Sequence, residues 1–233
     1  MKFSILTLFP EMFEPIKQSI IGRAVSSGKL LIEITNIRDY AQNKHNQVDD
    51  TPYGGGAGMV LKPDVVARSI NAVKSDNSKV IYMSPKGEKL TQSKVVELSK
   101  EEHLVILCGH YEGIDQRVID KYVDEEISIG DYVLTGGELP SMVLLDSVAR
   151  YIDGVLADGS TQEESFSQGL LEYPQYTKPQ VFEGLDVPEV LKNGNHKEIA
   201  KWRRKMSIIE TSKKRPDLLK NIELSDEEKE YLN

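Results

Sequence analysis

Three short turns rich in glycine, proline and polar residues hold the residue types in this chain that are best suited to binding a ligand. They are Ser84-Pro-Lys-Gly87, Gly109-His-Tyr-Glu-Gly113 and the stretch 130–137, Gly-Asp-Tyr-Val-Leu-Thr-Gly-Gly. Glycine tolerates positive φ and lets a ligand approach the backbone, so such turns suit a pocket lined by main-chain groups. An ordinary surface connection is an equal alternative for any one turn. Their repetition favours a cofactor held jointly by all three.

The elements that must position these turns alternate between strands and helices. Strands are predicted at 3–9, 30–37, 79–83, 104–108 and 123–129, the last of them less apolar and nearer an edge. Helices are predicted from apolar spacing at 16–26, 115–121 and 138–151, and two more are predicted to begin at Pro63 and after a Thr91 cap. In the helix at 138–151, Met142, Leu145, Val148 or Ala149, and Ile152 are expected to form the buried stripe. This alternation indicates a parallel α/β sheet with ligands at the carboxyl ends of its strands.

Composition is that of a globular protein, with 39% hydrophobic and 28% charged residues among 233. The single cysteine, Cys108, excludes an internal disulfide framework and fits a reducing compartment. Residues 1–9 mimic a secretion signal, but Pro10 and Glu11 follow too early, so a buried strand is predicted there. No apolar run approaches the roughly 18 residues that a membrane helix needs, so we expect a cytoplasmic protein without a membrane partner.

Charge is distributed unevenly along the chain. The net charge of −8 argues against non-specific adhesion of the whole chain to nucleic acid. Residues 192–220, however, hold ten Lys and Arg against three acidic residues, a local charge of +7, which leaves −15 on the remainder. An anionic partner should therefore meet the C-terminal part first.

The glycine run at 54–58 matches neither common nucleotide-binding fingerprint. No Lys-Ser/Thr follows at the spacing of a phosphate-binding loop, and Gly-x-Gly-x-x-Gly starting at Gly54 fails at Met59. A mobile or substrate-facing loop between Arg38 and Lys62 remains.

Low apolar content in 153–169 indicates a flexible linker and a domain boundary. We therefore divide the chain into a domain at 1–157, a flexible linker at 158–172 and a helical domain at 173–233. Helices are expected in the last part at about 187–192, 196–212 and 225–232.

Several motifs together resemble one family. The longest is Glu-Glu-Ile-Ser-Ile-Gly-Asp-Tyr-Val-Leu-Thr-Gly-Gly-Glu-Leu-Pro at 125–140. The others are Leu8-Phe-Pro-Glu-Met-Phe13, Val48-Asp-Asp-x-Pro-Tyr-Gly-Gly-Gly56, Cys108-Gly-x-Tyr-Glu-Gly-x-Asp115 and Gly194-Asn-His-x-x-Ile199. This set resembles the bacterial tRNA (guanine-N1)-methyltransferases of the TrmD type, in the knotted SPOUT class.

The resemblance implies a SPOUT-type parallel sheet with a deep C-terminal trefoil knot, followed by a small helical domain. Such knots are rare exceptions to the rule that chains do not thread their own loops. It also implies a homodimer with active sites at the protomer interface, and S-adenosylmethionine as the methyl donor. The implied reaction methylates N1 of guanosine 37, beside the tRNA anticodon, and so maintains the reading frame. By family motif, the cofactor-binding residues are Tyr82, Ser84, Pro85, Gly109, Tyr111, Glu112, Gly113, Ser128, Ile129, Gly130, Asp131, Tyr132, Val133, Leu134, Gly136, Gly137 and Pro140.

Two catalytic residues are also carried over from the family. N1 of guanine bears a proton, so methyl transfer needs a base, and a cation or donor should stabilise charge on O6. The resemblance places the base at Glu164 and the cation at Arg150. The family commonly has Asp at the base position, and Glu163 here is a competitor. Spacing alone would instead pair Arg150 with Asp146 across one helix turn.

The basic C-terminal segment is similar to the region that grips the tRNA anticodon arm. The residues concerned are Lys201, Arg203, Arg204, Lys213, Lys214 and Arg215. A solvated helix face is the alternative for about half of them. Magnesium is possible from the family, but no residues can be assigned to it, and no metal site is predicted. The competing functions are another SPOUT RNA methyltransferase with a different target nucleotide and a non-catalytic RNA-binding protein.

Overall fold

The computed structural model describes residues 1–157, 159–161 and 164–232. It forms two compact units, Met1–Ala157 and Asp158–Asn233.

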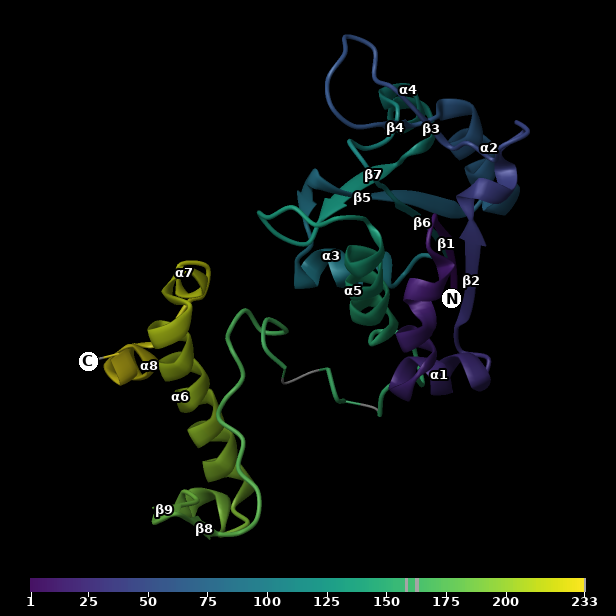
Figure 1. Ribbon diagram of the computed structural model, residues 1–233. Helices are drawn as coiled ribbons and strands as arrows, with labels where there is room; N and C mark the ends of the chain where they lie inside the picture. The colour runs from purple at the N-terminus through teal and green to yellow at the C-terminus, as the bar shows by residue number, and fades with distance from the viewer. Residues whose placement is uncertain (158, 162–163, 233) are drawn as a thin grey trace. The chain divides into compact units, whose positions relative to one another are not determined.

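The first unit is built on a five-stranded sheet in which every pairing is parallel (Figure 1). In spatial order its strands are β2 (Leu31–Asn36), β1 (Lys2–Thr7), β6 (His103–Cys108), β5 (Ser78–Lys89) and β7 (Glu125–Ser128). The predicted α/β class and parallel sheet are confirmed, and β7 lies at an edge as expected. The carboxyl ends of β5, β6 and β7 therefore meet at one side of the sheet.

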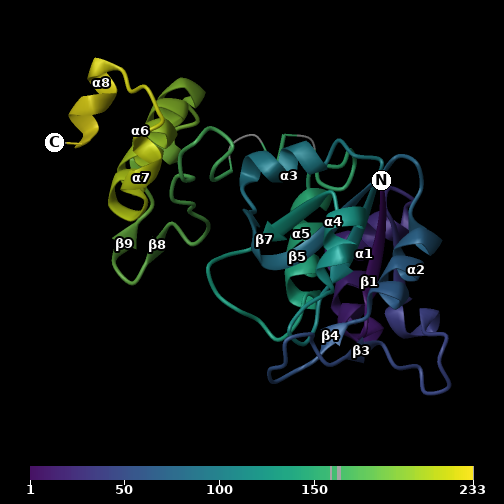
Figure 2. The same cartoon turned by 90° about the horizontal axis from the view of Figure 1, so that it is seen from above.

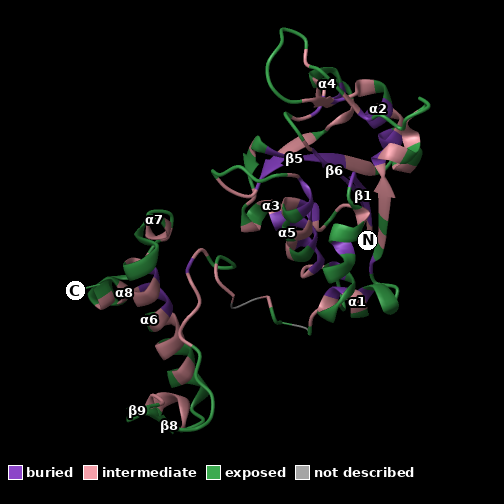
Figure 3. Ribbon diagram, in the orientation of Figure 1, coloured by how far each residue is buried: buried purple, intermediate pink, exposed green. Residues whose placement is uncertain are grey.

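Alternating side chains divide each central strand between two cores. Phe3, Ile5 and Ile106 belong to one buried cluster, whereas Leu6 and Leu107 belong to the other. This alternation is the period-two pattern of a strand that is covered on both faces. Figure 3 shows the resulting band of buried residues through the middle of the sheet.

Helices cover both faces of the sheet (Figure 2). On one face lie α1 (Ser19–Ser26), α3 (Gln92–Leu98) and α5 (Glu138–Ala149), and on the other lie α2 (Pro63–Val73) and α4 (Gln116–Tyr122). Pro63 begins α2, and the Thr91 hydroxyl caps α3 by accepting from the Lys94 N–H, both as predicted. Two 3₁₀ segments, η1 (Pro10–Lys17) and η2 (Ile37–Tyr40), follow β1 and β2.

The glycine-rich loop between η2 and α2 contains a short antiparallel pair that the sequence did not reveal. It consists of β3 (Asp49–Asp50) and β4 (Val60–Leu61). Leu61 N–H donates to the Gly113 carbonyl, and Glu112 N–H donates to the Met59 carbonyl. The loop is thereby attached to the turn that follows β6.

Two expectations about this unit need correction. The strand predicted to end at residue 83 continues to Lys89, because 84–87 bulges out while both Met83 and Glu88 pair with Ile127. In α5, Leu144 is fully buried, whereas Met142 is only partly buried. The reason is that α5 packs against β1, β6, α3 and η1, so more than one stripe of the helix is covered.

The second unit is centred on one long helix, α6 (His196–Lys214). Asn195 caps it by accepting from the Glu198 N–H, which accounts for the Gly-Asn-His motif at this point. Smaller elements surround it, namely the hairpin β8 (Val181–Phe182) and β9 (Leu185–Asp186), η3 (Glu189–Leu191), α7 (Pro216–Leu219), α8 (Asp226–Lys229) and η4 (Glu230–Leu232). The hairpin and α7 were not predicted.

Residues 164–172, predicted to be linker, pack on α6 in the structure. Leu171 N–H donates to the Thr211 hydroxyl at 2.9 Å, and Phe166 N–H donates to the Leu170 carbonyl at 2.7 Å. These bonds define a local turn within the second unit.

Candidate functional site

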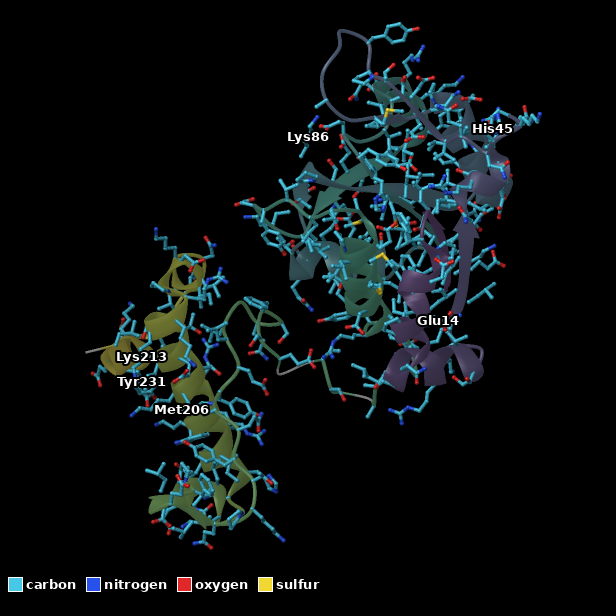
Figure 4. The ribbon with its side chains drawn as sticks, in the orientation of Figure 1. Glu14, His45, Lys86, Met206, Lys213 and Tyr231 are labelled. Carbon is cyan, nitrogen blue, oxygen red and sulfur yellow. The ribbon has the colours of Figure 1, made fainter. Side chains whose placement is uncertain are left out.

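A pocket of about 250 Å³ lies at the carboxyl ends of β5, β6 and β7. Its walls come from the bulge 84–87, the turn 109–113 and the loop 130–137, so the three turns singled out by composition do converge. Main-chain groups and apolar side chains such as Ile129 and Leu134 line it. Lys86, labelled in Figure 4, is exposed in the first of these turns.

Glycine is required where the turns meet one another. A Cβ at Gly137 would lie 2.7 Å from the Cα of Cys108 and 2.8 Å from the nitrogen of Gly109. The Gly137 N–H donates to the Gly109 carbonyl at 2.9 Å, so this contact joins the second and third turns directly. A Cβ at Gly109 would lie 2.7 Å from the Tyr82 hydroxyl oxygen. The turns can therefore pack this closely only because glycine has no side chain at these positions.

A buried carboxylate holds the base of the pocket together. Glu138, in the first turn of α5, is 1% exposed. Its Oε1 accepts a 2.6 Å hydrogen bond from the Thr7 hydroxyl, and its Oε2 is 2.7 Å from Nε2 of His110. The His110 ring also lies against the Phe9 ring, with 4.8 Å between centroids. Glu138 thus links the end of β1, the turn after β6 and the start of α5.

Burial shifts the pKa values of two groups around the pocket. Burial, with a smaller contribution from the Glu126 carboxylate, raises the pKa of Tyr82 to about 12, so its hydroxyl stays protonated. Burial also raises the pKa of the Cys108 thiol far above its ordinary range, and the nearby Glu138 adds to this. Cys108 is therefore a packing residue, whose Sγ lies 3.0 Å from the Ser141 hydroxyl.

The structure places all but one of the predicted cofactor residues on this pocket. Asp131 is the exception, because its exposed side chain pairs with Lys89 at 2.9 Å. Sequence reasoning missed Met83, His110, Ile127 and Thr135, which also line the pocket. His110 could have been included, since it stands between Gly109 and Tyr111 in a turn already singled out.

The comparisons with known proteins match nearly the whole length of the chain. The family model described as tRNA (Guanine-1)-methyltransferase TrmD matches residues 1–221. This chain belongs to that family. A protein of Syntrophomonas wolfei named tRNA (guanine-N(1)-)-methyltransferase is 58% identical over 234 residues, covering 100% of this chain and 96% of its own. Proteins of the same name are similar in Desulforamulus reducens, at 54% identity (100% and 94% covered), and in Clostridium perfringens, at 57% (98% and 97%).

The two catalytic residues implied by the TrmD family lie in different units. Arg150 is the C-cap residue of α5, and its backbone N–H donates to the Asp146 carbonyl at 3.4 Å. Glu164 lines a second pocket of about 130 Å³ on α6, together with Leu171, Tyr173 and Arg203 among others. The competing carboxylate, Glu163, lies outside the described residues. Each assignment remains a prediction.

Most of the predicted RNA-binding cations are already engaged by carboxylates within the second unit. Lys214 pairs with Glu210 at 2.5 Å, and Arg215 pairs with Asp217 at 2.7 Å. Lys201 pairs with Glu227 and Arg204 pairs with Glu228, both on α8. Arg203 lies over the Tyr173 ring, 4.7 Å from its centroid, and Lys213 is exposed. Primary sequence shows the number of cations but not their partners.

Within the described ranges, no group of three or more His, Cys, Asp or Glu side chains could hold a metal ion. In the same part of the chain, no helix combines the length and apolarity needed to span a bilayer.

Proposed function

We propose that this protein transfers the methyl group of S-adenosylmethionine to N1 of guanosine 37 in tRNA. The observation that carries the proposal is the family match over residues 1–221, together with relatives of that name that are 54–58% identical over their full length. The pocket formed by three glycine-rich turns at the end of a parallel sheet fits a nucleoside-sized cofactor approached by main-chain donors and acceptors.

S-adenosylmethionine would supply a methyl group on a sulfonium, which is an electrophile that needs no further activation. The Tyr82, Leu134 and Gly137 region would hold it, and the close packing of the glycine turns on one another would fix the shape of this region. The buried Glu138–His110 pair fixes the turn that borders this space. Positioning of the two reactants is the part of catalysis that such a rigid wall supplies.

The chain's own residues would then handle the proton and the charge of the guanine. Glu164 accepts the proton from N1 as the methyl group is transferred, and Arg150 donates a hydrogen bond to O6, where negative charge develops. The products are S-adenosylhomocysteine, N1-methylguanosine and a protonated Glu164.

A trefoil knot in the first unit also belongs to this proposal. In the sheet, β5 separates β6 from β7, and yet the chain leaving β7 returns to bond Gly137 to Gly109 at the end of β6. This crossing beside the bulge 84–87 supports a threaded chain. We likewise propose a linker at 158–172 and a tRNA-binding domain at 173–233.

A homodimer with shared active sites completes the assembly that we propose. Leu139 and Val143, four residues apart on α5, have exposed fractions of 49% and 47%, and Val133 in the pocket loop is 83% exposed. Exposed apolar side chains on one side of a helix, such as Leu139 and Val143, are typical of protein interfaces. We expect Val143→Glu to convert a dimer to a monomer in light scattering and to abolish turnover, because each site would then lack its partner. A dimer that survives this change would argue for another interface.

The decisive experiment incubates the purified protein with labelled S-adenosylmethionine and unmodified tRNA carrying guanosine at positions 36 and 37 (tRNA numbering). We expect label at N1 of guanosine 37. Label on another nucleotide would indicate a SPOUT methyltransferase of different target, and binding of cofactor and tRNA without turnover would indicate a non-catalytic RNA-binding protein.

Variants of the linker carboxylate test the mechanism. We expect Glu164→Ala to lower turnover by about 10²–10⁴-fold while S-adenosylmethionine affinity is retained. Glu163→Ala is the matched control, one residue away. Near-normal turnover of Glu164→Ala with loss in Glu163→Ala would move the base to Glu163.

Lysine variants at the end of α6 test whether this helix binds tRNA. Lys213→Ala should weaken tRNA binding and flatten its salt dependence, since about 0.7–0.9 of a counterion is released per phosphate contact. Lys214→Ala should do less, because Glu210 already holds that ammonium group. Equal slopes for wild type and Lys213→Ala would exclude Lys213 from the interface.

A further inference from the structure

One side of α6 carries three cations at helical spacing. Lys201, Arg204 and Lys205 are three and four residues apart, so they lie along the same side of the helix. Such a row suits a phosphate backbone, because phosphate contacts position nucleic acid without reading its bases. In this structure all three side chains contact the C-terminal residues of the chain, although Lys201 and Lys205 stay exposed.

The C-terminal residues 222–232, which we call the acidic arm, cover this row. The Glu227 carboxylate lies 2.6 Å from the Lys201 ammonium, and the Glu228 carboxylate accepts a 2.7 Å hydrogen bond from Arg204 Nε. The Lys205 ammonium lies 4.9 Å from the centroid of the Tyr231 ring, which Figure 4 shows beside α6. Each of the three cations therefore contacts the arm.

The arm has the charge of a phosphate-bearing segment. It contains five acidic residues and one lysine, a net charge of −4, directly after the stretch of +7 at 192–220. It also begins at the residue that follows the end of the family match, which covers residues 1–221. Its carboxylates supply to Arg204 and Lys201 the acceptors that phosphate oxygens would otherwise supply.

The acidic arm is bound to α6 weakly enough for a polyanion to displace it. The four-residue helix α8 has a capping box at Ser225, but a helix of this length is not stable without tertiary contacts. The side chains of Lys201 and Glu227 are 59% and 63% exposed, and ion pairs that exposed contribute little. A polyanion with many phosphates can therefore compete for the same cations.

We propose that Lys201, Arg204 and Lys205 form an RNA phosphate-binding surface that the acidic arm occupies in the free protein and leaves when RNA binds. This inference rests on the proposed function only in taking RNA as the polyanion. It predicts that the arm lowers RNA affinity. Salt should weaken the arm and the RNA contacts together, so the effect of the arm should shrink as salt rises.

The test compares two double variants that change the net charge of the arm equally. Glu227→Gln with Glu228→Gln removes both carboxylates that contact α6. Asp226→Asn with Glu230→Gln is the matched control, since Asp226 pairs with Lys229 inside the arm. Affinity for unmodified tRNA is measured by filter binding from low to high salt, with the full chain in every case.

We expect the first double variant to bind tRNA about 2–30-fold more tightly at low salt, from the usual strength of two surface ion pairs, of which Lys201–Glu227 is exposed and Arg204–Glu228 is partly buried, and to approach wild type at high salt. The control should stay within about twofold of wild type. Adding Lys201→Gln and Arg204→Gln to the first variant should remove the gain, because the surface itself is then lost.

Equal tightening of both double variants would overturn the proposal, because net charge alone would then explain it. Unchanged or weaker binding of the first variant would show that the arm is only structural. Absence of methyl incorporation in every variant would refute the proposed function while leaving the binding comparison readable. Retained turnover, together with equal tRNA dissociation constants for wild type and the Glu227→Gln, Glu228→Gln variant, would refute only the proposed role of the acidic arm. No measurable tRNA binding by any variant would refute both.

Discussion

Replacing Glu138 by Gln should destabilise the first unit and also weaken ligand binding in the pocket at the ends of β5, β6 and β7. Glu138 is buried and accepts from both the Thr7 hydroxyl and His110 Nε2. Glutamine has nearly the same shape but only one oxygen, so one donor loses its acceptor and meets an NH₂ group. Hydrogen bonds to charged groups contribute about 1.5–3 kcal/mol each, so we expect a loss of about that size in the free energy of unfolding.

Thermal and urea unfolding measure this loss. For a chain of this length about 1 kcal/mol corresponds to roughly 2–4 °C in Tm, so the variant should melt about 3–12 °C lower. Titration calorimetry should also show weaker S-adenosylmethionine binding, because His110 and the adjoining glycine turn form the pocket wall. The control is Glu14→Gln, an exposed glutamate labelled in Figure 4, which should change stability by less than about 0.5 kcal/mol.

A double-mutant cycle isolates the contact. Thr7→Val removes one donor, so its effect and that of Glu138→Gln should be non-additive by about 0.5–3 kcal/mol. If Glu138→Gln unfolds within 0.5 kcal/mol of wild type (roughly the spread of surface substitutions), the buried carboxylate does not hold these elements together and the reasoning is wrong.

Three further predictions concern the same unit. Gly137→Ala should cost about 1–3 kcal/mol and weaken cofactor binding in calorimetry, because its Cβ would meet main-chain atoms at 2.7–2.8 Å; wild-type affinity would mean that the turn can move aside. The Cys108 thiol should not react with Ellman's reagent at pH 8 until urea unfolds the chain, since burial raises its pKa; rapid native labelling would contradict this. Burial lowers the pKa of His103 below its ordinary value of 6.5, so the imidazole takes up a proton more readily in the unfolded chain than in the folded one. The urea midpoint of unfolding should therefore fall as the pH drops below about 6.5. His103→Gln should flatten that fall, and an unchanged pH profile would show that another group is responsible.

The sequence correctly predicted those helices and strands whose determinants lie within a single segment of the chain. The proline that begins α2, the Thr91 cap and the apolar run of β6 each depend on neighbouring residues alone. The bulge in β5 depends instead on a partner. A Cβ at Gly87 would lie 2.3 Å from the backbone of Glu126, so glycine there reflects contact with a strand that lies 39 positions later in the chain. No pattern within 84–87 distinguishes such a contact from a turn.

The unpredicted hairpin of β8 and β9 has a different explanation. Its two turn residues, Glu183 and Gly184, have φ of +50° and +83°. Asn-Gly or Asp-Gly is the usual signal for two consecutive positive φ angles. Glutamate adopts this conformation less readily, so the Gly184 signal alone did not indicate a hairpin.

The pocket could be predicted from the sequence, whereas the catalytic pair remains a proposal. The reason is that the two depend on different structural requirements. Part of the pocket wall is made of turns that pack closely on one another, and this packing requires glycine at defined positions, which a motif records directly. A general base requires only a carboxylate within reach of N1, and Glu163 and Glu164 satisfy that requirement equally in sequence. Their difference is geometric and depends on where residues 163 and 164 lie when guanosine is bound. The Glu163 and Glu164 variants therefore decide which of the two carboxylates is the base.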